Sequence, residues 1–261
     1  MNYIEISSRN NEKIKYVNKL VASSKERNRA SLFVCEGMRL CYDAVISGYS
    51  VKEVYITHDA ISKYNEKAQV ITDNAEKVFL ITDEVKDKLS DTVNSQGVFC
   101  VVEMKHGTTE EVTAGKRYIA LDSVQNPQNL GTVARTAEAL GIQGVIVSGG
   151  CDIYNPKALR ASMGSLLRIP VIRTDNLCAL IENLNSCGVL TFSTVPDNSA
   201  RDITTLDFSR GAVAVIGNEG NGVSQEVRNI TSTLATIKMR GNAESLNASS
   251  AAVITMWEMM K

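Results

Sequence analysis

The chain has 261 residues, of which 44% are hydrophobic and 22% are charged, and its formal net charge is −1. This is a globular composition with ample material for a core. No apolar run approaches the roughly 20 residues that span a bilayer, and the N-terminal sequence lacks the apolar segment of a secretory signal. We therefore expect a cytoplasmic protein with no membrane partner.

Cysteine and histidine usage argues against several kinds of site. The six cysteines include no CxxC pair, and the two histidines, His58 and His106, both precede the motif-rich half of the chain. Unclustered cysteines in a long chain are typical of reduced, buried thiols. A metal site and a His-based catalytic triad are disfavoured, so we expect no metal.

The first predicted element is a charged amphipathic helix over residues 11–30. Residues 1–31 carry seven basic and three acidic side chains. This excess of positive charge can hold a nucleic acid backbone, although a solvated helix face would look the same. The candidate phosphate-binding residues are Arg9, Lys13, Arg27 and Arg29.

Short β-rich runs and helical stretches alternate after this helix. The runs cover residues 32–35, 51–57, 77–82 and 97–103, and a helical pattern over 38–46 lies between the first two. They predict a small α/β domain over residues 1–105. Residues 106–116 are polar, contain two glycines and show no periodicity, which is typical of a linker.

Beyond the linker, the alternation becomes regular and predicts a second domain over residues 117–261. Apolar runs at 118–122, 144–148, 189–195 and 212–217 alternate with helical patterns at 132–140, 156–167, 176–185 and 246–260. Continuously apolar strands separated by helices predict a parallel sheet covered on both faces. Ligands bind at the carboxyl ends of such strands.

Three loops at these strand ends carry candidate chemistry. In residues 122–135, Asn129 is suited to cap a helix, and Arg135 follows about one and a half turns into that helix. Its guanidinium could face a phosphate or a developing alkoxide, or could form only a salt bridge.

The second loop, residues 215–224, has three glycines in six positions, which permits close backbone approach to a ligand. It matches neither GxGxxG nor a P-loop, so a dinucleotide or ATP site is unsupported. The third segment, residues 237–252, passes from a strand predicted at 235–239 into a helix rich in small residues, which allows another backbone to pack closely. Each loop, taken alone, is also compatible with a purely structural role.

The order and spacing of the three loops resemble the SpoU (TrmH-like) branch of the SPOUT methyltransferases. Asn129, Gly131 and Arg135 match its motif 1, residues 217–222 its motif 2, and residues 244–247 its motif 3. Residues 155–164 also match a typical intervening segment. The first hundred residues resemble, more loosely, the family's L30e-like substrate-binding domain through residues 33–37 and the preceding basic helix.

Two positions depart from the family pattern. The usual Asp-Pro of motif 1 is Asn126-Pro127, and the usual Ile-Pro-Met of motif 3 is Ile237-Lys238-Met239. Neither departure removes a residue assigned to chemistry, but Lys238 adds a backbone N–H and a charge to the expected cofactor loop.

The resemblance implies an α/β fold: a Rossmann-like parallel sheet with a deep trefoil knot, preceded by the small L30e-like domain. It also implies a homodimer and S-adenosylmethionine as the cofactor. The residues that would bind the cofactor are Gly217, Asn218, Gly220, Ile237, Met239 and Leu246. The residues that would form the catalytic site are Arg135, Asn129, Glu219, Ser245 and Asn247.

Arg135 occupies the position of the motif 1 arginine, to which the role of general base is usually assigned in this family. Neutralising an arginine at pH 7 costs at least ~7 kcal/mol, because its pKa exceeds ~12.5. We therefore expect Arg135 to act as a fixed positive charge that stabilises the emerging alkoxide.

The implied reaction is methyl transfer to a ribose 2′-hydroxyl of structured RNA, and the appended N-terminal domain favours 23S ribosomal RNA. A transfer RNA substrate stays open, as does a non-catalytic knotted RNA-binding or ribosome assembly factor. The missing GxGxxG and the basic first helix oppose a Rossmann-type small-molecule enzyme.

Overall fold

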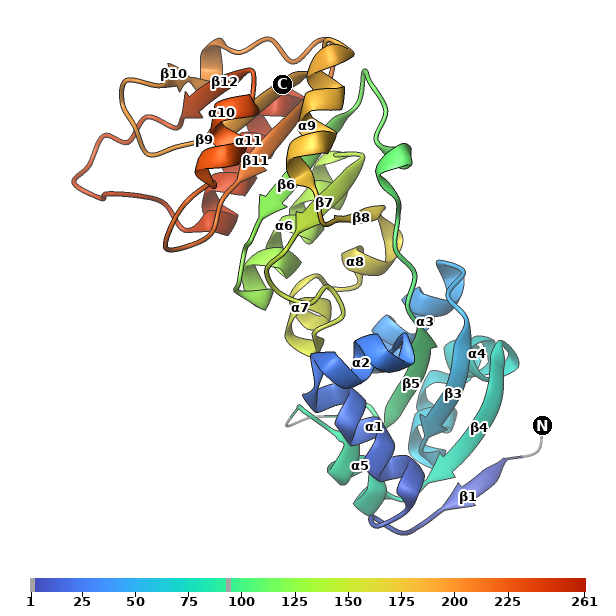
Figure 1. The fold of residues 1–261 in the computed structure, drawn as a ribbon. Helices are drawn as coiled ribbons and strands as arrows, with labels where there is room; N and C mark the ends of the chain where they lie inside the picture. The colour runs from blue at the N-terminus through green and yellow to red at the C-terminus, as the bar shows by residue number, and fades with distance from the viewer. Residues whose placement is uncertain (1–2, 93–94) are drawn as a thin grey trace. The chain divides into compact units, whose positions relative to one another are not determined.

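Residues 3–92 and 95–261 are described by a computed structural model, in which the chain forms two α/β units (Figure 1). Unit 1 is the chain up to Lys105 together with Tyr154–Arg168, and unit 2 is His106–Ile153 together with Ile169–Lys261. The sequence placed a boundary at the same point, before residue 106. It assigned residues 154–168 to the second domain, however, whereas they group with the first unit.

Unit 1 is built on a five-stranded mixed sheet in the order β1-β4-β3-β5-β2. β4 pairs in parallel with β1 and β3, and β5 is antiparallel to both β3 and β2. The strands are β1 (Ile4–Ile6), β2 (Leu32–Glu36), β3 (Val51–Ile56), β4 (Ala75–Ile81) and β5 (Val98–Glu103). Four of the five correspond to predicted runs. β1, with three residues, is too short to show an alternating pattern.

The helix predicted over residues 11–30 is in fact two helices, α1 (Glu12–Ala22) and α2 (Ser24–Ala30). Ser23 is extended, at φ −126° and ψ 116°, and its side chain accepts a hydrogen bond from the Glu26 amide at 3.3 Å. A serine that caps a new helix in this way ends the previous one. The other helices of the N-terminal segment are α3 (Met38–Ile46), α4 (His58–Asp73) and α5 (Asp83–Leu89).

Arg27 points into unit 1, although the sequence predicted that it binds RNA. Its side chain is buried, with 2% exposure, and its Nη1 donates to the carbonyls of Leu20 at 2.6 Å and Val21 at 2.9 Å. These carbonyls belong to the last turn of α1, which has no further helical N–H to accept from. A guanidinium in this position cannot reach an RNA phosphate, so the prediction that Arg27 binds RNA is wrong.

The segment Tyr154–Arg168 forms two short helices, α7 (Pro156–Ala161) and α8 (Ser165–Arg168), where one continuous helix was predicted. The break falls at Met163 and Gly164, whose φ angles of 51° and 89° are left-handed and end a helix.

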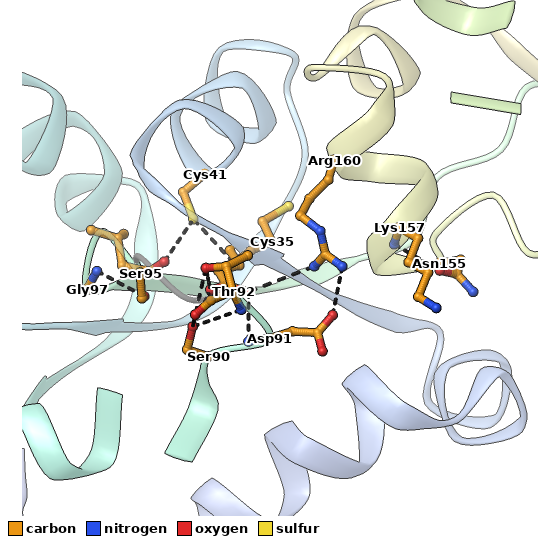
Figure 2. Close-up of polar contacts among 12 residues, drawn as sticks. Cys35, Cys41, Ser90, Asp91, Thr92, Ser95, Gly97, Asn155, Lys157 and Arg160 are labelled. Carbon is orange, nitrogen blue, oxygen red and sulfur yellow. Dashed lines mark hydrogen bonds and ion pairs between the residues drawn. The ribbon is translucent and has the colours of Figure 1, made fainter. Parts of the chain in front are cut away.

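Stacking and charge hold this segment within unit 1. The Tyr154 ring stacks on Phe33 with ring centroids 4.2 Å apart. Arg160 Nη2 lies 2.7 Å from Asp91 Oδ2 (Figure 2). The neighbouring Glu36 carboxylate accepts hydrogen bonds from the Ser90 and Thr92 hydroxyls at 2.8 and 2.7 Å.

Unit 2 contains a seven-stranded, wholly parallel sheet in the order β10-β12-β9-β11-β6-β7-β8. The strands are β6 (Arg117–Asp122), β7 (Gly144–Ser148), β8 (Val171–Thr174), β9 (Leu190–Thr194), β10 (Arg201–Asp202), β11 (Ala212–Ile216) and β12 (Thr233–Thr236). The parallel sheet confirms the predicted fold class. The strand expected at 235–239 ends at Thr236, so residues 237–239 lie in the following loop.

Helices cover both faces of this sheet, which explains why its central strands β6, β7 and β11 are almost continuously apolar. The helices are α6 (Pro127–Leu140), α9 (Leu177–Ser186), α10 (Gln225–Ile230) and α11 (Ala248–Met260). On one face, α9 packs with alternate residues of β6 and β11, such as Ala120 and Val215. α6 and α11 pack against each other, and α11 also contacts β6 and β11.

The register of the central strands places their carboxyl ends together. Ile216 of β11 pairs with Leu121 of β6, and Val215 pairs with Ser193 of β9. The loops that follow β6, β9 and β11 therefore leave the same edge of the sheet. The trefoil knot implied by the resemblance stays a prediction. None of the helices in the described part of the chain is both long enough and apolar enough to cross a membrane.

Candidate functional site

The loop after β6 leads into α6, and the cap of that helix is Asn126. Its side chain accepts a hydrogen bond from the Gln128 amide at 2.9 Å, and Pro127 occupies the first helical turn. The prediction that Asn129 caps the helix is therefore wrong. Asn caps a helix as well as Asp does, so the replacement of the family's Asp-Pro by Asn126-Pro127 preserves the helix start.

Asn129 instead connects two loops. It is buried, with 5% exposure, and its amide donates to Glu219 Oε1 at 2.8 Å. The Glu219 carboxylate also accepts the backbone N–H of Asn126 and of Gln125, each at 3.0 Å. Burial would raise the pKa of Glu219, but these three donors outweigh it and hold the pKa below its ordinary value. Glu219 is thus ionised at neutral pH and fixes the loop after β6 to the loop after β11.

The loop after β11 is closed by its own backbone and by Asn218. Asn218 and Gly222 exchange backbone hydrogen bonds of 3.0 and 2.9 Å, and the Asn218 side chain accepts from Gly220 and Asn221 at 2.9 and 3.1 Å. A Cβ at Gly217 would lie 2.0 Å from Gly222 C, so only glycine fits where the two arms of the loop meet.

Two further hydrogen bonds join this loop to the end of β6. Asn218 donates its side-chain amide to the Ser123 carbonyl at 2.9 Å, and the buried Asp122 accepts the Ser224 amide at 2.8 Å. These two hydrogen bonds fix the backbone of the loop after β11 relative to the end of β6.

The third segment runs from β12 to α11. Asn247 accepts the backbone N–H of Ser249 at 2.9 Å and of Ser250 at 3.4 Å, so it is the N-cap of α11. Lys238, which stands where the family has proline, pairs with Asp202 Oδ2 at 3.2 Å. This ion pair ties the segment to β10.

A cavity of about 330 Å³ opens between these loops, within the range of small-ligand sites. All six predicted cofactor-binding residues line it, as do Glu219 and Ser245. Asn129 does not line the cavity but donates a hydrogen bond to Glu219, which does. Asn247 and Arg135 are exposed and do not line it. Their catalytic roles stay predictions.

Two parts of the cavity wall were not predicted. Thr194, Val195 and Pro196 lie at and beyond the end of β9, so the rule that ligands bind at strand carboxyl ends could have identified them. Arg228 lies on α10, a helix of six residues with no motif to mark it.

Comparison with known protein families identifies the class of protein to which these loops and this cavity belong. The model of the SpoU rRNA Methylase family matches residues 116–257, and the model of the MRM3-like substrate binding domain matches residues 11–100. The chain belongs to the SpoU rRNA methylase family.

Particular relatives resemble the chain over most of its length. The 23S rRNA (guanosine(2553)-2′-O)-methyltransferase RlmP of Bacillus subtilis is 30% identical over 256 residues, 98% of each chain. The 23S rRNA (uridine(2479)-2′-O)-methyltransferase of Streptomyces viridochromogenes is 28% identical over 250 residues, covering 93% of this chain and 87% of the relative. The AdoMet-bound rRNA methyltransferase from Sinorhizobium meliloti aligns with a TM-score of 0.87 at 29% identity, covering 98% of this chain and 97% of that one.

Proposed function

We propose that this protein transfers a methyl group from S-adenosylmethionine to a ribose 2′-hydroxyl of 23S ribosomal RNA. The observation that carries the proposal is the single cavity in which six predicted cofactor residues, Glu219 and Ser245 meet. Both full-length relatives described above are named as 23S rRNA 2′-O-methyltransferases. We place the protein in the cytoplasm, with its RNA.

The cavity fits this cofactor. Ile237, Met239 and Leu246 offer apolar surface for an adenine, and the Gly217 loop exposes backbone groups that can hydrogen-bond to it. Bound there, S-adenosylmethionine supplies a methyl group that its sulfonium has already activated. The protein then has to orient the ribose and help its hydroxyl to lose a proton.

Arg135 supplies the positive charge for that step. It is exposed on α6 and pairs with no acidic side chain in the part of the chain that the structure describes, so its guanidinium is available to RNA. A charged Arg135 orients the ribose-phosphate and stabilises the developing alkoxide without giving up its own proton.

A homodimer completes the site in this proposal. α11 packs against α6, and on the outer side of α11 the side chains of Ile254 and Trp257 are 39% and 57% exposed. Large apolar side chains exposed together on a helix are typical of an interface. Dimerisation through α11 brings Arg135 of α6 to the interface, where it can serve a cavity that it does not line within its own chain.

Unit 1 holds the RNA in this proposal. Arg9, Lys13 and Arg29 lie on its surface, each within 4 Å of one glutamate, namely Glu84, Glu53 and Glu26 respectively. Arg9 and Arg29 are more than half exposed and can exchange these partners for phosphates, which makes binding dependent on salt concentration.

The test is methylation of ribosomal RNA by the purified protein, with 2′-O-methyl sites mapped in total RNA from cells with and without the gene. Arg135→Ala is expected to lose about 100-fold or more in turnover, and Arg135→Lys to recover part of it. Methylation of transfer RNA alone, or of no RNA, would contradict the proposal. RNA binding without methylation would indicate a non-catalytic factor and would likewise contradict the proposal.

A further inference from the structure

The cavity wall contains two charged side chains among the residues that the structure describes, Glu219 and Arg228. Glu219 is already occupied by the N–H groups of Gln125, Asn126 and Asn129. It does not pair with Arg228. The positive charge of Arg228 is therefore unbalanced in the cavity.

Arg228 also has hydrogen-bond donors to spare. A guanidinium carries five N–H groups, and here Nη2 donates one to Gln225 Oε1 at 2.8 Å. Its Nε is buried and has no acceptor among the described residues. Partial desolvation strengthens the attraction of such a group for an anion, and leaving it without one is costly.

The chemistry of the cofactor selects the anion. Its adenine and ribose are neutral, its sulfonium and ammonium are positive, and its methionine carboxylate is the one negative group. A cation in the wall repels the sulfonium and the ammonium of the cofactor and attracts its carboxylate. The planar fork of an arginine also matches a carboxylate in shape.

We infer that Arg228 binds the methionine carboxylate of S-adenosylmethionine and so sets the direction in which the cofactor lies in the cavity. The inference rests on the proposed function, because it requires that this cofactor occupies the cavity. Arg228 is a positioning residue: it holds the end of the cofactor remote from the adenine, and the methyl group is thereby aimed at the ribose.

Binding of two ligands, of which one lacks the amino acid group that bears this carboxylate, tests the inference. S-adenosylhomocysteine carries the amino acid, whereas 5′-methylthioadenosine lacks it. Calorimetric titration of Arg228→Gln is expected to give a Kd for S-adenosylhomocysteine about 10–100-fold weaker than wild type, the range for a hydrogen bond to a charged group. The Kd for 5′-methylthioadenosine should stay within about twofold.

Arg173→Gln on β8 is the matched control, because Arg173 is exposed and does not line the cavity. It should leave both Kd values unchanged. Should Arg228→Gln fail to fold, Arg228→Lys keeps the charge without the fork and is expected to weaken S-adenosylhomocysteine alone, by about 3–10-fold.

Three results would overturn the inference while leaving the proposed function intact. The first is that Arg228→Gln binds S-adenosylhomocysteine as wild type does. The second is that the substitution weakens the binding of both ligands equally. The third is a raised KM for RNA with both Kd values unchanged, which would assign Arg228 to an RNA phosphate. Failure of the wild-type protein to bind either ligand would instead overturn the proposed function, and this inference with it.

Discussion

Glu219 and Asn129 lie 90 positions apart in the chain, and their hydrogen bond joins the loop after β6 to the loop after β11. The carboxylate of Glu219 accepts three N–H groups from one short stretch, and these hydrogen bonds stabilise its negative charge. An exposed acidic residue of the cavity wall therefore holds the two loops together.

The lowered pKa of Glu219 predicts a pH-dependent contribution to stability. A carboxyl whose folded-state pKa lies below its ordinary value of 4.5 stabilises the fold above that value, and the contribution is lost as the pH falls through the folded-state pKa. We expect Glu219→Gln to lower the unfolding free energy by on the order of 1 kcal/mol at pH 7, a modest figure because the side chain is exposed.

Chemical denaturation of both proteins between about pH 3 and pH 7 measures this difference, which should disappear at the acidic end. Glu182→Gln, at an exposed position on α9, is the control and should behave as wild type throughout. A difference that did not depend on pH would show that the charge of Glu219 is not what holds the loops.

At the scale of elements, the buried side chain of Arg27 on α2 caps the C-terminal end of α1. The guanidinium supplies N–H groups to carbonyls of α1 that lack helical partners. Arg27→Met, which keeps much of the volume, should therefore lower the unfolding free energy by about 2–4 kcal/mol, because it leaves buried acceptors unsatisfied.

Arg29→Met makes the matched comparison. Arg29 belongs to the same helix, but its side chain is 71% exposed and forms a surface ion pair with Glu26. Its loss should change stability by less than about 0.5 kcal/mol. Thermal and urea unfolding of the two variants measure both values, and equal losses would contradict the capping role of Arg27.

The centre of the parallel sheet in unit 2 was predictable because β6, β7 and β11 are buried on both faces and almost continuously apolar. β8 (Val171–Thr174) and β10 (Arg201–Asp202) were not predicted, because they are short and contain charged residues. The cavity was largely predictable as well, because the loops that line it follow predicted strands. What the sequence concealed is where two arginine side chains point. Arg27 looks like any other basic residue of an exposed helix, and nothing near Arg228 marks it as part of the cavity wall.

Local patterns also failed where a single residue interrupts a helical period. Ser23 and Met163 are compatible with a helix interior, and both predicted helices were extended through them. In the structure, Ser23 is extended and Met163 is left-handed. Such breaks cannot be located from helix propensity, which is a weak preference.

At the scale of the whole molecule, the exposed apolar face of α11 predicts how the chain assembles. Trp257→Glu places a charge in the proposed interface and should convert a dimer into a monomer, with little loss of stability because the side chain is 57% exposed. Light scattering after size exclusion measures the mass.

Ile46→Glu on α3 is an equivalent change at a side chain that is 56% exposed, and it should leave the assembly intact. A Trp257→Glu protein that stays dimeric, or a wild-type protein that is monomeric, would contradict the proposed interface. If dimerisation completes the site, the monomeric variant should also bind S-adenosylhomocysteine yet lose methyl transfer.

The grouping of Tyr154–Arg168 with unit 1 has a consequence for how the protein is made. When the first 105 residues have left the ribosome, Phe33 still lacks the ring that stacks on it and Asp91 lacks its cation. β6 and β7 are synthesised before those partners, and β8 only after them. Unit 1 therefore cannot be completed until residue 168 has been synthesised, after β6 and β7 of unit 2, and a single genetic crossover could not exchange either unit whole.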